Sequence, residues 1–135
     1  MDTMQAIAGT DIYLLDQLMK KNIHPGQRIL DAGCGMGSNI TWLLNRGAEV
    51  WGIDISEDDI KYLQKTFPHA KDHFIQSTIE SFSAPVKFDV VICSAVLHFA
   101  RSHDHFEDMF GQLVSFLKPG GVLFIRMASN IGMER

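Results

Sequence analysis

Three closely spaced glycines and two acidic residues are the part of this sequence best suited to chemistry. The run Asp31-Ala32-Gly33-Cys34-Gly35-Met36-Gly37 places an acid directly before the glycines, and a second acid, Asp54, ends the next apolar run. Glycine lets the backbone turn tightly, and its missing side chain lets a ligand lie directly on the main chain. A carboxylate after the following strand can accept hydrogen bonds from both hydroxyl groups of a ribose. The spacing therefore predicts a site for a ribose-containing ligand.

The residues around the glycines narrow the class of ligand. The spacing Gly-x-Gly-x-Gly departs from the Gly-x-Gly-x-x-Gly fingerprint of dinucleotide-binding domains, which disfavours a nicotinamide cofactor. No Gly-Lys-Ser/Thr sequence follows, so the loop is not a phosphate-cradling P-loop. Asp31 would repel a pyrophosphate, whereas its charge suits a cationic amino group. A helix predicted to begin near Ser38 adds the N–H groups of its first turn to the loop.

Short apolar runs alternate with helical patterns along the chain. The predicted strands cover residues 28–31, 49–53, 73–76, 88–93 and 122–127. Predicted helices begin at the capping residues Thr10, Ser56 and Ser102, and a further one lies between the glycines and Gly47. Strands that alternate with helices predict an α/β fold with a mostly parallel, doubly wound sheet. In such a fold, ligands bind at the carboxyl ends of the strands.

Composition and charge limit the class of protein. The 135 residues, 46% hydrophobic and 21% charged, fit a single globular domain. The formal net charge of −4 gives no electrostatic footprint for nucleic acid, so no nucleic-acid partner is expected. No stretch approaches the roughly 20 apolar residues that span a bilayer, so no membrane association is expected. The two cysteines, Cys34 and Cys93, are too few for a disulfide framework and favour a cytoplasmic location.

Four motifs in order resemble those of the class I S-adenosylmethionine-dependent methyltransferases. Ile29–Gly37 is similar to their first motif, and Asp54 matches the acidic residue after their second strand. Residues 88–94 resemble their fourth-strand motif, and residues 117–121 resemble the turn before their fifth strand. The resemblance implies one Rossmann-like domain over residues 1–135, with an N-terminal helical segment (1–26) and a cofactor-binding core (27–127).

The resemblance also implies ligand contacts for individual residues. Gly33, Cys34 and Gly35 are expected to lie against the methionine part of S-adenosylmethionine, with Asp31 facing its amino group. Residues after later strands are expected to contact the rest of the cofactor: Asp54 the ribose, Ile55, Ser77 and Thr78 the adenine, and Ser94 and Ala95 the methyl end. Many relatives carry an acid where this sequence has the hydroxyls of Ser77 and Thr78.

His98 is the candidate general base for a reaction at this site. It follows the fourth predicted strand on the side where an acceptor approaches, and histidine titrates near neutral pH. The alternative is that His98 packs locally and makes a structural hydrogen bond. His103 and His105 lie at the start of a predicted helix and point to different faces, so no metal site is expected.

The activity implied is methyl transfer to a small molecule by in-line displacement, with S-adenosylhomocysteine as the product. Two alternatives are a cofactor-binding module without catalytic activity and, less favoured, a nicotinamide-dependent oxidoreductase. Family members usually continue past the fifth strand into a helix and a strand hairpin, whereas this sequence stops at Arg135. We therefore expect a C-terminally truncated chain with an exposed fifth-strand edge, Val122 to Met127, through which a homodimer could form.

Overall fold

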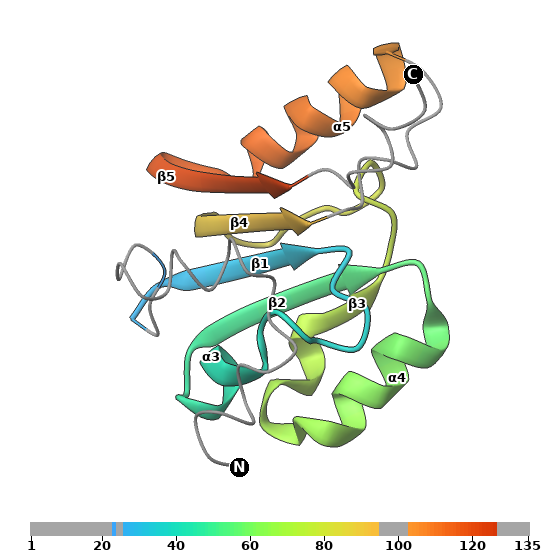
Figure 1. Cartoon of the computed structure of the whole chain (residues 1–135), viewed down its shortest axis with the longest axis vertical. Helices are drawn as coiled ribbons and strands as arrows, with labels where there is room; N and C mark the ends of the chain where they lie inside the picture. The colour runs from blue at the N-terminus through green and yellow to red at the C-terminus, as the bar shows by residue number, and fades with distance from the viewer. Residues whose placement is uncertain (1–22, 24–25, 95–102, 127–135) are drawn as a thin grey trace.

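Five parallel strands form the sheet that organises the described part of the chain (Figure 1). This computed structural model describes residues 23, 26–94 and 103–126, and at 94, 103–106 and 126 it describes the backbone alone. The strands are β1 (Arg28–Ala32), β2 (Glu49–Asp54), β3 (Phe74–Gln76), β4 (Phe88–Ser94) and β5 (Leu117–Arg126). They lie in the order β3-β2-β1-β4-β5, and every neighbouring pair is parallel. The predicted α/β class with a parallel sheet is confirmed.

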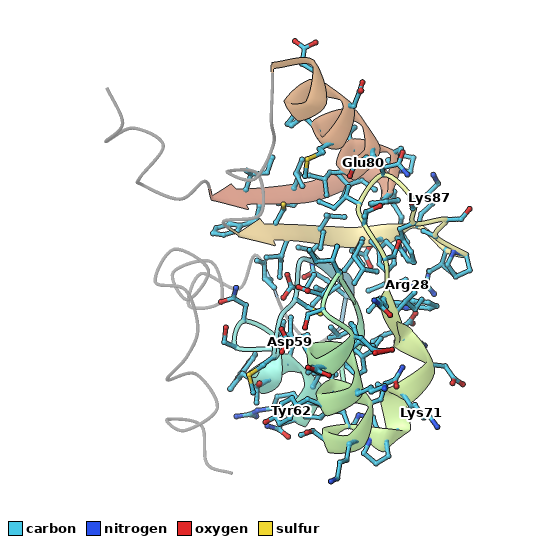
Figure 2. All side chains as sticks on the ribbon, turned by 90° about the vertical axis from the view of Figure 1, so that its right-hand side faces the viewer. Arg28, Asp59, Tyr62, Lys71, Glu80 and Lys87 are labelled. Carbon is cyan, nitrogen blue, oxygen red and sulfur yellow. The ribbon has the colours of Figure 1, made fainter. Side chains whose placement is uncertain are left out.

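Helices cover both faces of this sheet, as a doubly wound fold requires. They are α3 (Thr41–Asn45), α4 (Glu57–Thr66), the 3₁₀ helix η1 (Pro68–His73) and α5 (His103–Ser115). Successive strand residues point to opposite faces, so Ile29 packs with the buried side chains of α3 and α4, whereas Leu30 packs with those of α5. Figure 2 shows Tyr62 on α4, below β4, and Glu80 in the loop before β4, near the height of β5.

The start and end of α4 follow from local chemistry. Ser56 caps the helix, as predicted, because its hydroxyl accepts a hydrogen bond from the amide of Asp59 at 3.2 Å. Acidic residues fill the first turn, where the helix dipole favours them. Pro68 follows the C-cap residue Phe67 and begins η1, since proline has no N–H to continue an α-helix. The helix therefore starts just beyond the carboxyl end of β2.

The helix after the glycines begins later than predicted. Instead of starting near Ser38, α3 begins at Thr41 and has five residues. The carbonyl of Gly37 accepts hydrogen bonds from the amides of Ile40 and Thr41, at 3.1 and 3.0 Å, so a turn precedes the helix. The predicted helix start near Ser38 is therefore wrong, and the amide of Ile40 is bonded within this turn and is not free for a ligand.

Two strand boundaries also differ from the sequence prediction. His73, predicted to start the third strand, ends η1, where its Nδ1 lies 3.2 Å from the carbonyl oxygen of Val50 and its ring stacks on Trp51. The fifth strand begins at Leu117 rather than Val122, because Leu117 already pairs with Phe88 of β4. Regular pairing resumes at Val122 after an irregular stretch that the sequence pattern marks as a turn.

β5 is the outer strand of the described sheet. The side chain of Val122 is 44% exposed there, and pairing of this edge with a second copy of the chain stays a prediction. The predicted caps Thr10 and Ser102 lie outside the described residues, and the domain boundary at residues 26/27 stays a prediction as well. Among the described helices, none is long and apolar enough to cross a membrane.

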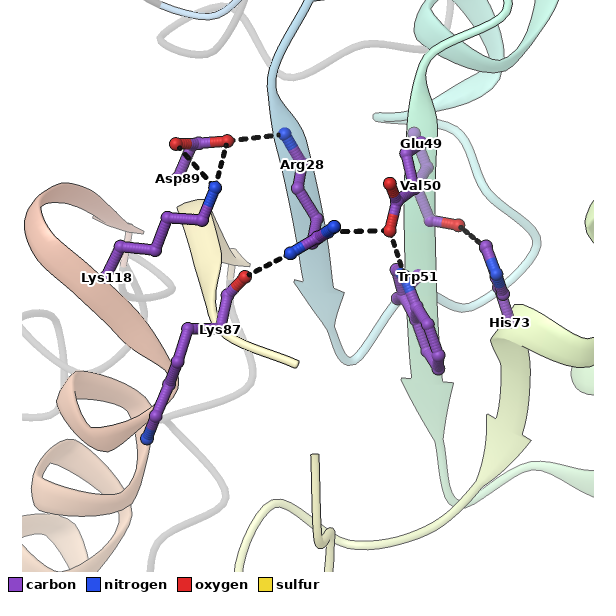
Figure 3. Close-up of polar contacts among 8 residues, drawn as sticks. All are labelled: Arg28, Glu49, Val50, Trp51, His73, Lys87, Asp89 and Lys118. Atoms are coloured by element: carbon purple, nitrogen blue, oxygen red, sulfur yellow. Dashed lines mark hydrogen bonds and ion pairs between the residues drawn. The ribbon is translucent and has the colours of Figure 1, made fainter. Parts of the chain in front are cut away.

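A polar network ties the strands together at the amino-terminal edge of the sheet (Figure 3). Asp89 of β4 accepts a hydrogen bond from the backbone amide of Arg28 in β1 at 2.8 Å and pairs with Lys118 of β5 at 3.3 Å. The Arg28 guanidinium donates to Glu49 of β2 at 2.7 Å, and the indole N–H of Trp51 donates to the same carboxylate oxygen. This network lies at the opposite edge from the glycine loop, so it can stabilise the sheet without occupying the ligand site.

We predict that Asp89→Ala lowers the free energy of unfolding by about 1 kcal/mol at pH 7, a small value because the Asp89–Lys118 pair is partly screened by solvent. The Arg28 amide and the Lys118 ammonium lower the pKa of Asp89 below its ordinary value. Its stabilisation is thus present above about pH 4 and is lost as the pH falls through the lowered pKa. In urea unfolding, the difference in free energy of unfolding between Asp89→Ala and the native chain should shrink as the pH is lowered from 7 to 3. Asp72→Ala on η1 is the carboxylate control. A constant difference across that range would contradict the assignment.

Candidate functional site

The glycine loop sits on the carboxyl end of β2, where three backbone amides hold it. The amides of Gly33 and Cys34 both donate to the carbonyl oxygen of Ile53, at 2.7 and 3.0 Å. The amide of Gly35 donates to Oδ2 of Asp54 at 2.9 Å. The loop that follows β1 is therefore attached directly to the end of β2, and the two predicted halves of the site come together.

Positive φ angles favour glycine at all three positions of the loop, and Gly37 is also required for space. Gly35 has a φ of +52°, in the left-handed region that side chains disfavour, and a Cβ on it would meet nothing within 4 Å. Gly37 has a φ of +87°, and a Cβ on it would lie 2.8 Å from the side chain of Leu63 in α4. The loop is thus pressed against α4 at Gly37 and open beside Gly35, where a ligand can approach the main chain.

Asp31 is the buried charge of the site. Its side chain, at the end of β1, is 1% exposed, and among the described residues its Oδ2 has no hydrogen-bond partner. Burial, and secondarily the negative charge of Asp54, raise the pKa of Asp31 to about 7. A buried carboxylate oxygen without a partner is costly, and a cation beside it relieves that cost. From the sequence, Asp31 is expected to face the cationic amino group of the ligand.

Asp54 uses both carboxylate oxygens to organise the backbone around it. Oδ2 accepts from the amide of Gly35, and Oδ1 accepts from the amide of Ser56 at 2.8 Å. Asp54 is therefore a turn former beside the cap of α4 and also a support of the glycine loop. Each carboxylate oxygen has two lone pairs, so both can still accept hydrogen bonds from the hydroxyls of a ligand.

The residues expected at the adenine end surround Asp54. Ile55 is 71% exposed, which leaves a large apolar side chain available to a flat ring. The amide of Ser77 donates to the carbonyl oxygen of Asp54 at 3.0 Å, so the loop after β3 begins beside the end of β2. The hydroxyl of Ser77 donates to the carbonyl of Thr78, whose own hydroxyl accepts from the amide of Ser81. Ser77 thus keeps acceptor capacity and Thr78 keeps a donor.

Two residues beside the site were not among those predicted from the sequence. Met36, between the second and third glycines, is 57% exposed and adds an apolar surface to the loop. Gln76, the last residue of β3, donates from its amide nitrogen to the carbonyl of Ile55 at 3.2 Å and so holds the backbone there. Proximity to the glycines could have indicated Met36, whereas the contact of Gln76 depends on the pairing of β3 with β2.

The side chain of Cys34 is buried beneath the glycine loop. The residue is 6% exposed and its thiol belongs to the apolar core between the sheet and the α3–α4 layer. The expected contact of Cys34 with the methionine part of a ligand stays a prediction, and with the thiol buried it would be made by the backbone. Burial raises the pKa of the Cys34 thiol, so it stays protonated and is not a nucleophile.

The acceptor side of the site is described only in part. Ala95 and His98 lie outside the described residues, as do the side chains of Ser94, His103 and His105. The backbone of Ser94 ends β4, which runs parallel to β1, so it lies at the same sheet edge as the glycine loop. The contacts predicted for Ser94, Ala95 and His98 stay predictions.

A family model for the methyltransferase domain matches residues 29–121, from the first residues of β1 to the turn within β5. The chain belongs to this methyltransferase family. The matched range contains the glycine loop, Asp31 and Asp54. Membership also argues against the alternative of a nicotinamide-dependent oxidoreductase.

Curated relatives of this methyltransferase domain have different acceptors in their names. Trans-aconitate 2-methyltransferase of Rhodopseudomonas palustris (strain BisB18) is 33% identical over 119 residues, which cover 86% of this chain and 44% of that protein. Malonyl-(acyl-carrier protein) O-methyltransferase of Enterobacter lignolyticus is 33% identical, covering 76% and 40%. tRNA U34 carboxymethyltransferase of Idiomarina loihiensis is 35% identical, covering 74% and 32%. The chain spans less than half the length of these relatives.

Solved methyltransferase structures share the fold. DesVI of Streptomyces venezuelae superposes with a TM-score of 0.73 at 19% identity, over 86% of this chain and 51% of that one. Magnesium protoporphyrin IX methyltransferase (ChlM) of Synechocystis PCC 6803, solved with bound SAM, gives a TM-score of 0.64 at 28% identity, over 78% and 52%. These matches confirm the Rossmann-like methyltransferase fold predicted from the sequence.

We predict that Asp31→Asn changes the pH dependence of stability. In the native fold Asp31 keeps its proton up to about pH 7, whereas the unfolded chain releases it near pH 4, so the free energy of unfolding falls as the pH rises between these values. The Asn variant should lack this fall, and it should gain about 2–3 kcal/mol relative to the native chain between pH 5 and pH 8.

Urea unfolding of the cofactor-free protein at the two pH values measures this difference. Comparing pH values cancels any pH-independent cost of burying an amide at residue 31. Asp58→Asn, at an exposed position in the first turn of α4, is the matched control and should keep the native pH profile. Parallel profiles for the native chain and Asp31→Asn would show that Asp31 titrates normally.

Proposed function

We propose that this chain binds S-adenosylmethionine and provides the methyl-donor site of an enzyme that methylates a small molecule. The observation that carries the proposal is the buried carboxylate of Asp31, whose Oδ2 has no partner among the described residues, directly before the glycine loop. Asp54, on the neighbouring strand, still has acceptor capacity for two hydroxyls. A ligand with a cationic amino group at one end and a ribose at the other satisfies both carboxylates.

The residues of the chain have distinct tasks at this site. When bound, S-adenosylmethionine supplies a methyl group that its sulfonium charge has already activated. Asp31 holds the amino group, the backbone beside Gly35 lies along the methionine part, and Asp54 holds the ribose. Because in-line displacement depends on orientation, the rigid attachment of the loop to Ile53 and Asp54 is the main contribution of the protein on the donor side.

The adenine is proposed to lie between Ile55 and the loop that begins at Ser77. Ile55 offers an exposed apolar side chain for one face of the ring. The hydroxyl of Ser77 can accept a hydrogen bond from an exocyclic amino group, and that of Thr78 can donate one to a ring nitrogen. Two neutral hydroxyls thus take the place of the acid that many relatives use at this position.

A small-molecule acceptor is favoured by the charge of the chain. The formal net charge is −4, which repels the phosphates of a nucleic acid. The names of the relatives include trans-aconitate and a malonyl group on acyl carrier protein. An RNA acceptor is the second candidate, because a relative named for tRNA U34 is 35% identical. Turnover assays with carboxylic acids and with transfer RNA separate these two acceptor classes.

We further propose His98 as the general base for an acceptor that must lose a proton. Its support is topological, since it follows β4 shortly after Ser94, and β4 runs beside β1 and parallel to it.

A cytoplasmic location is also proposed. It is supported by the two buried free thiols, Cys34 and Cys93, the second with a pKa that burial raises to about 12.

We predict that Asp54→Ala weakens binding of S-adenosylhomocysteine roughly 30-fold or more, since charged hydrogen bonds contribute about 1.5–3 kcal/mol each. The variant loses the ribose contacts and also the support of the Gly35 amide. Calorimetry on the native chain, Asp54→Ala and the control Asp58→Ala measures the effect. If the native chain binds neither sulfur cofactor, or prefers a nicotinamide cofactor, the proposed function is contradicted. If Asp54→Ala binds as the native chain does, Asp54 does not hold the ribose.

We also predict that affinity for S-adenosylhomocysteine rises as the pH increases from 6 to 8. The raised pKa of Asp31, about 7, leaves the carboxyl largely protonated at pH 6, and only its ionised form attracts the amino group of the ligand. Asp31→Asn should bind more weakly and with a flat pH profile over this range. The same calorimetric titration at three pH values is the measurement, and an equally flat profile for the native chain would contradict the role of Asp31.

A further inference from the structure

Gly52 is a buried glycine that lies beneath the ligand site and not within the glycine loop. It is in β2, where its register partners are Asp31 of β1 and Phe74 of β3. A Cβ built on it would lie 2.8 Å from the Sγ of Cys34 and 3.2 Å from both the Cβ of Cys34 and the Cδ1 of Phe74. Its backbone is outside the left-handed region, so space, and not conformation, requires glycine at this position.

The thiol that fills this space belongs to the loop itself. The amides of Gly33 and Cys34 attach the loop to Ile53, the residue directly after Gly52, and the amide of Gly35 attaches it to Asp54. These three hydrogen bonds draw the loop towards β2, and the side chain of Cys34 rests on the bare backbone of Gly52. The Sγ of Cys34 occupies the space that a side chain at residue 52 would fill. This contact therefore sets how closely the loop can approach β2.

We propose that Cys34 and Gly52 form a packing pair that sets the position of the glycine loop, which makes Gly52 a positioning residue of the ligand site. The inference rests on the proposed function for the identity of the ligand, and on the described contacts for the geometry. It gives the side chain of Cys34 a role from beneath the loop.

A methyl group at residue 52 cannot be accommodated by rotating the thiol alone. The thiol is packed in the apolar core, so Sγ has little room to turn away from the 2.8 Å contact, and the Cβ of Cys34 at 3.2 Å must also give by a few tenths of an ångström. The ring of Phe74 restricts the other side. The loop must therefore rise, and the hydrogen bond from Gly35 to Asp54 lengthens with it.

The test adds a methyl group at residue 52 and removes the sulfur at residue 34, singly and together, in the 135-residue chain. Gly52→Ala should weaken S-adenosylhomocysteine binding about tenfold or more, and Cys34→Ala about threefold, because removing the sulfur loosens the loop without lifting it. The double variant Cys34→Ala/Gly52→Ala should recover most of the affinity that Gly52→Ala loses, since removing the sulfur abolishes the 2.8 Å contact and leaves only the milder contacts at 3.2 Å.

Two further measurements separate positioning from general destabilisation. Amide NMR shifts of Gly33 and Gly35 in the cofactor-free protein should move in Gly52→Ala and return in the double variant. Gly111→Ala is the matched control, because a Cβ there meets nothing within 4 Å, and it should change neither the loop amides nor the affinity. Urea unfolding of each variant shows whether affinity and stability change independently, as a positioning role requires.

The outcomes distinguish this inference from the proposed function. Native-like binding by Gly52→Ala, or a double variant that binds no better than Gly52→Ala, would overturn the packing pair. If Gly52→Ala fails to fold, the double variant decides, because it is expected to fold and bind. If the native chain binds no sulfur cofactor, the proposed function fails, and the loop amides still decide whether Cys34 and Gly52 act as a pair.

Discussion

The carbonyl oxygen of Ile53 accepts two amides from the glycine loop, and the whole ligand site depends on this junction. It exists because β1 and β2 pair in parallel with Ala32 opposite Ile53, so the loop leaves β1 at the level where β2 ends. A slip of one residue would turn every side chain of β2 to the other face. The side chain of Asp54 would then point away from the glycine loop, and each apolar side chain of β2 would face the opposite core. The register that buries both cores is thus the register that builds the site.

Charged side chains gather at the two ends of the strands, and they are paired at one end and unpaired with cations, among the described residues, at the other. At the amino-terminal edge, the carboxylates of Glu49 and Asp89 are paired with Arg28 and Lys118 and link four strands (Figure 3). At the carboxyl edge, no described residue places a cation against Asp31 or Asp54, and the negative charge of Asp54 adds to the cost of ionising Asp31. The protein therefore holds negative charge ready where a cationic ligand is proposed to bind, and the opposite edge contributes stability.

Much of the fold follows from local patterns in the sequence. The parallel sheet, the cap by Ser56 and the stop at Pro68 are confirmed, because each depends on residues adjacent in the chain or on strands that are continuously apolar. The meeting of the glycine loop with Asp54 could also be expected, since carboxyl ends of parallel strands share an edge. These features need little knowledge of tertiary packing.

Other features depend on contacts that no local pattern contains. A turn closed by the carbonyl of Gly37 precedes α3, and no local pattern shows that regular helical hydrogen bonding begins only after it. The direction of the Cys34 thiol depends on the missing side chain of Gly52 in another strand. The hydrogen bond of Gln76 to the backbone of Ile55 depends on the pairing of β3 with β2. Such details control the precision of the site, whereas the sequence motif predicts its location.

The protonation state of Asp31 tests the central claim most directly, because the proposed ligand places a cation beside this carboxyl group. Carbon-13 NMR of the Asp31 carboxyl, titrated with and without S-adenosylhomocysteine, reports its pKa in both states. We expect a pKa of about 7 in the free protein and a pKa close to the ordinary aspartate range in the complex. A pKa that stays at about 7 when the ligand is bound would show that its amino group does not lie beside Asp31, and would contradict the assignment of the site.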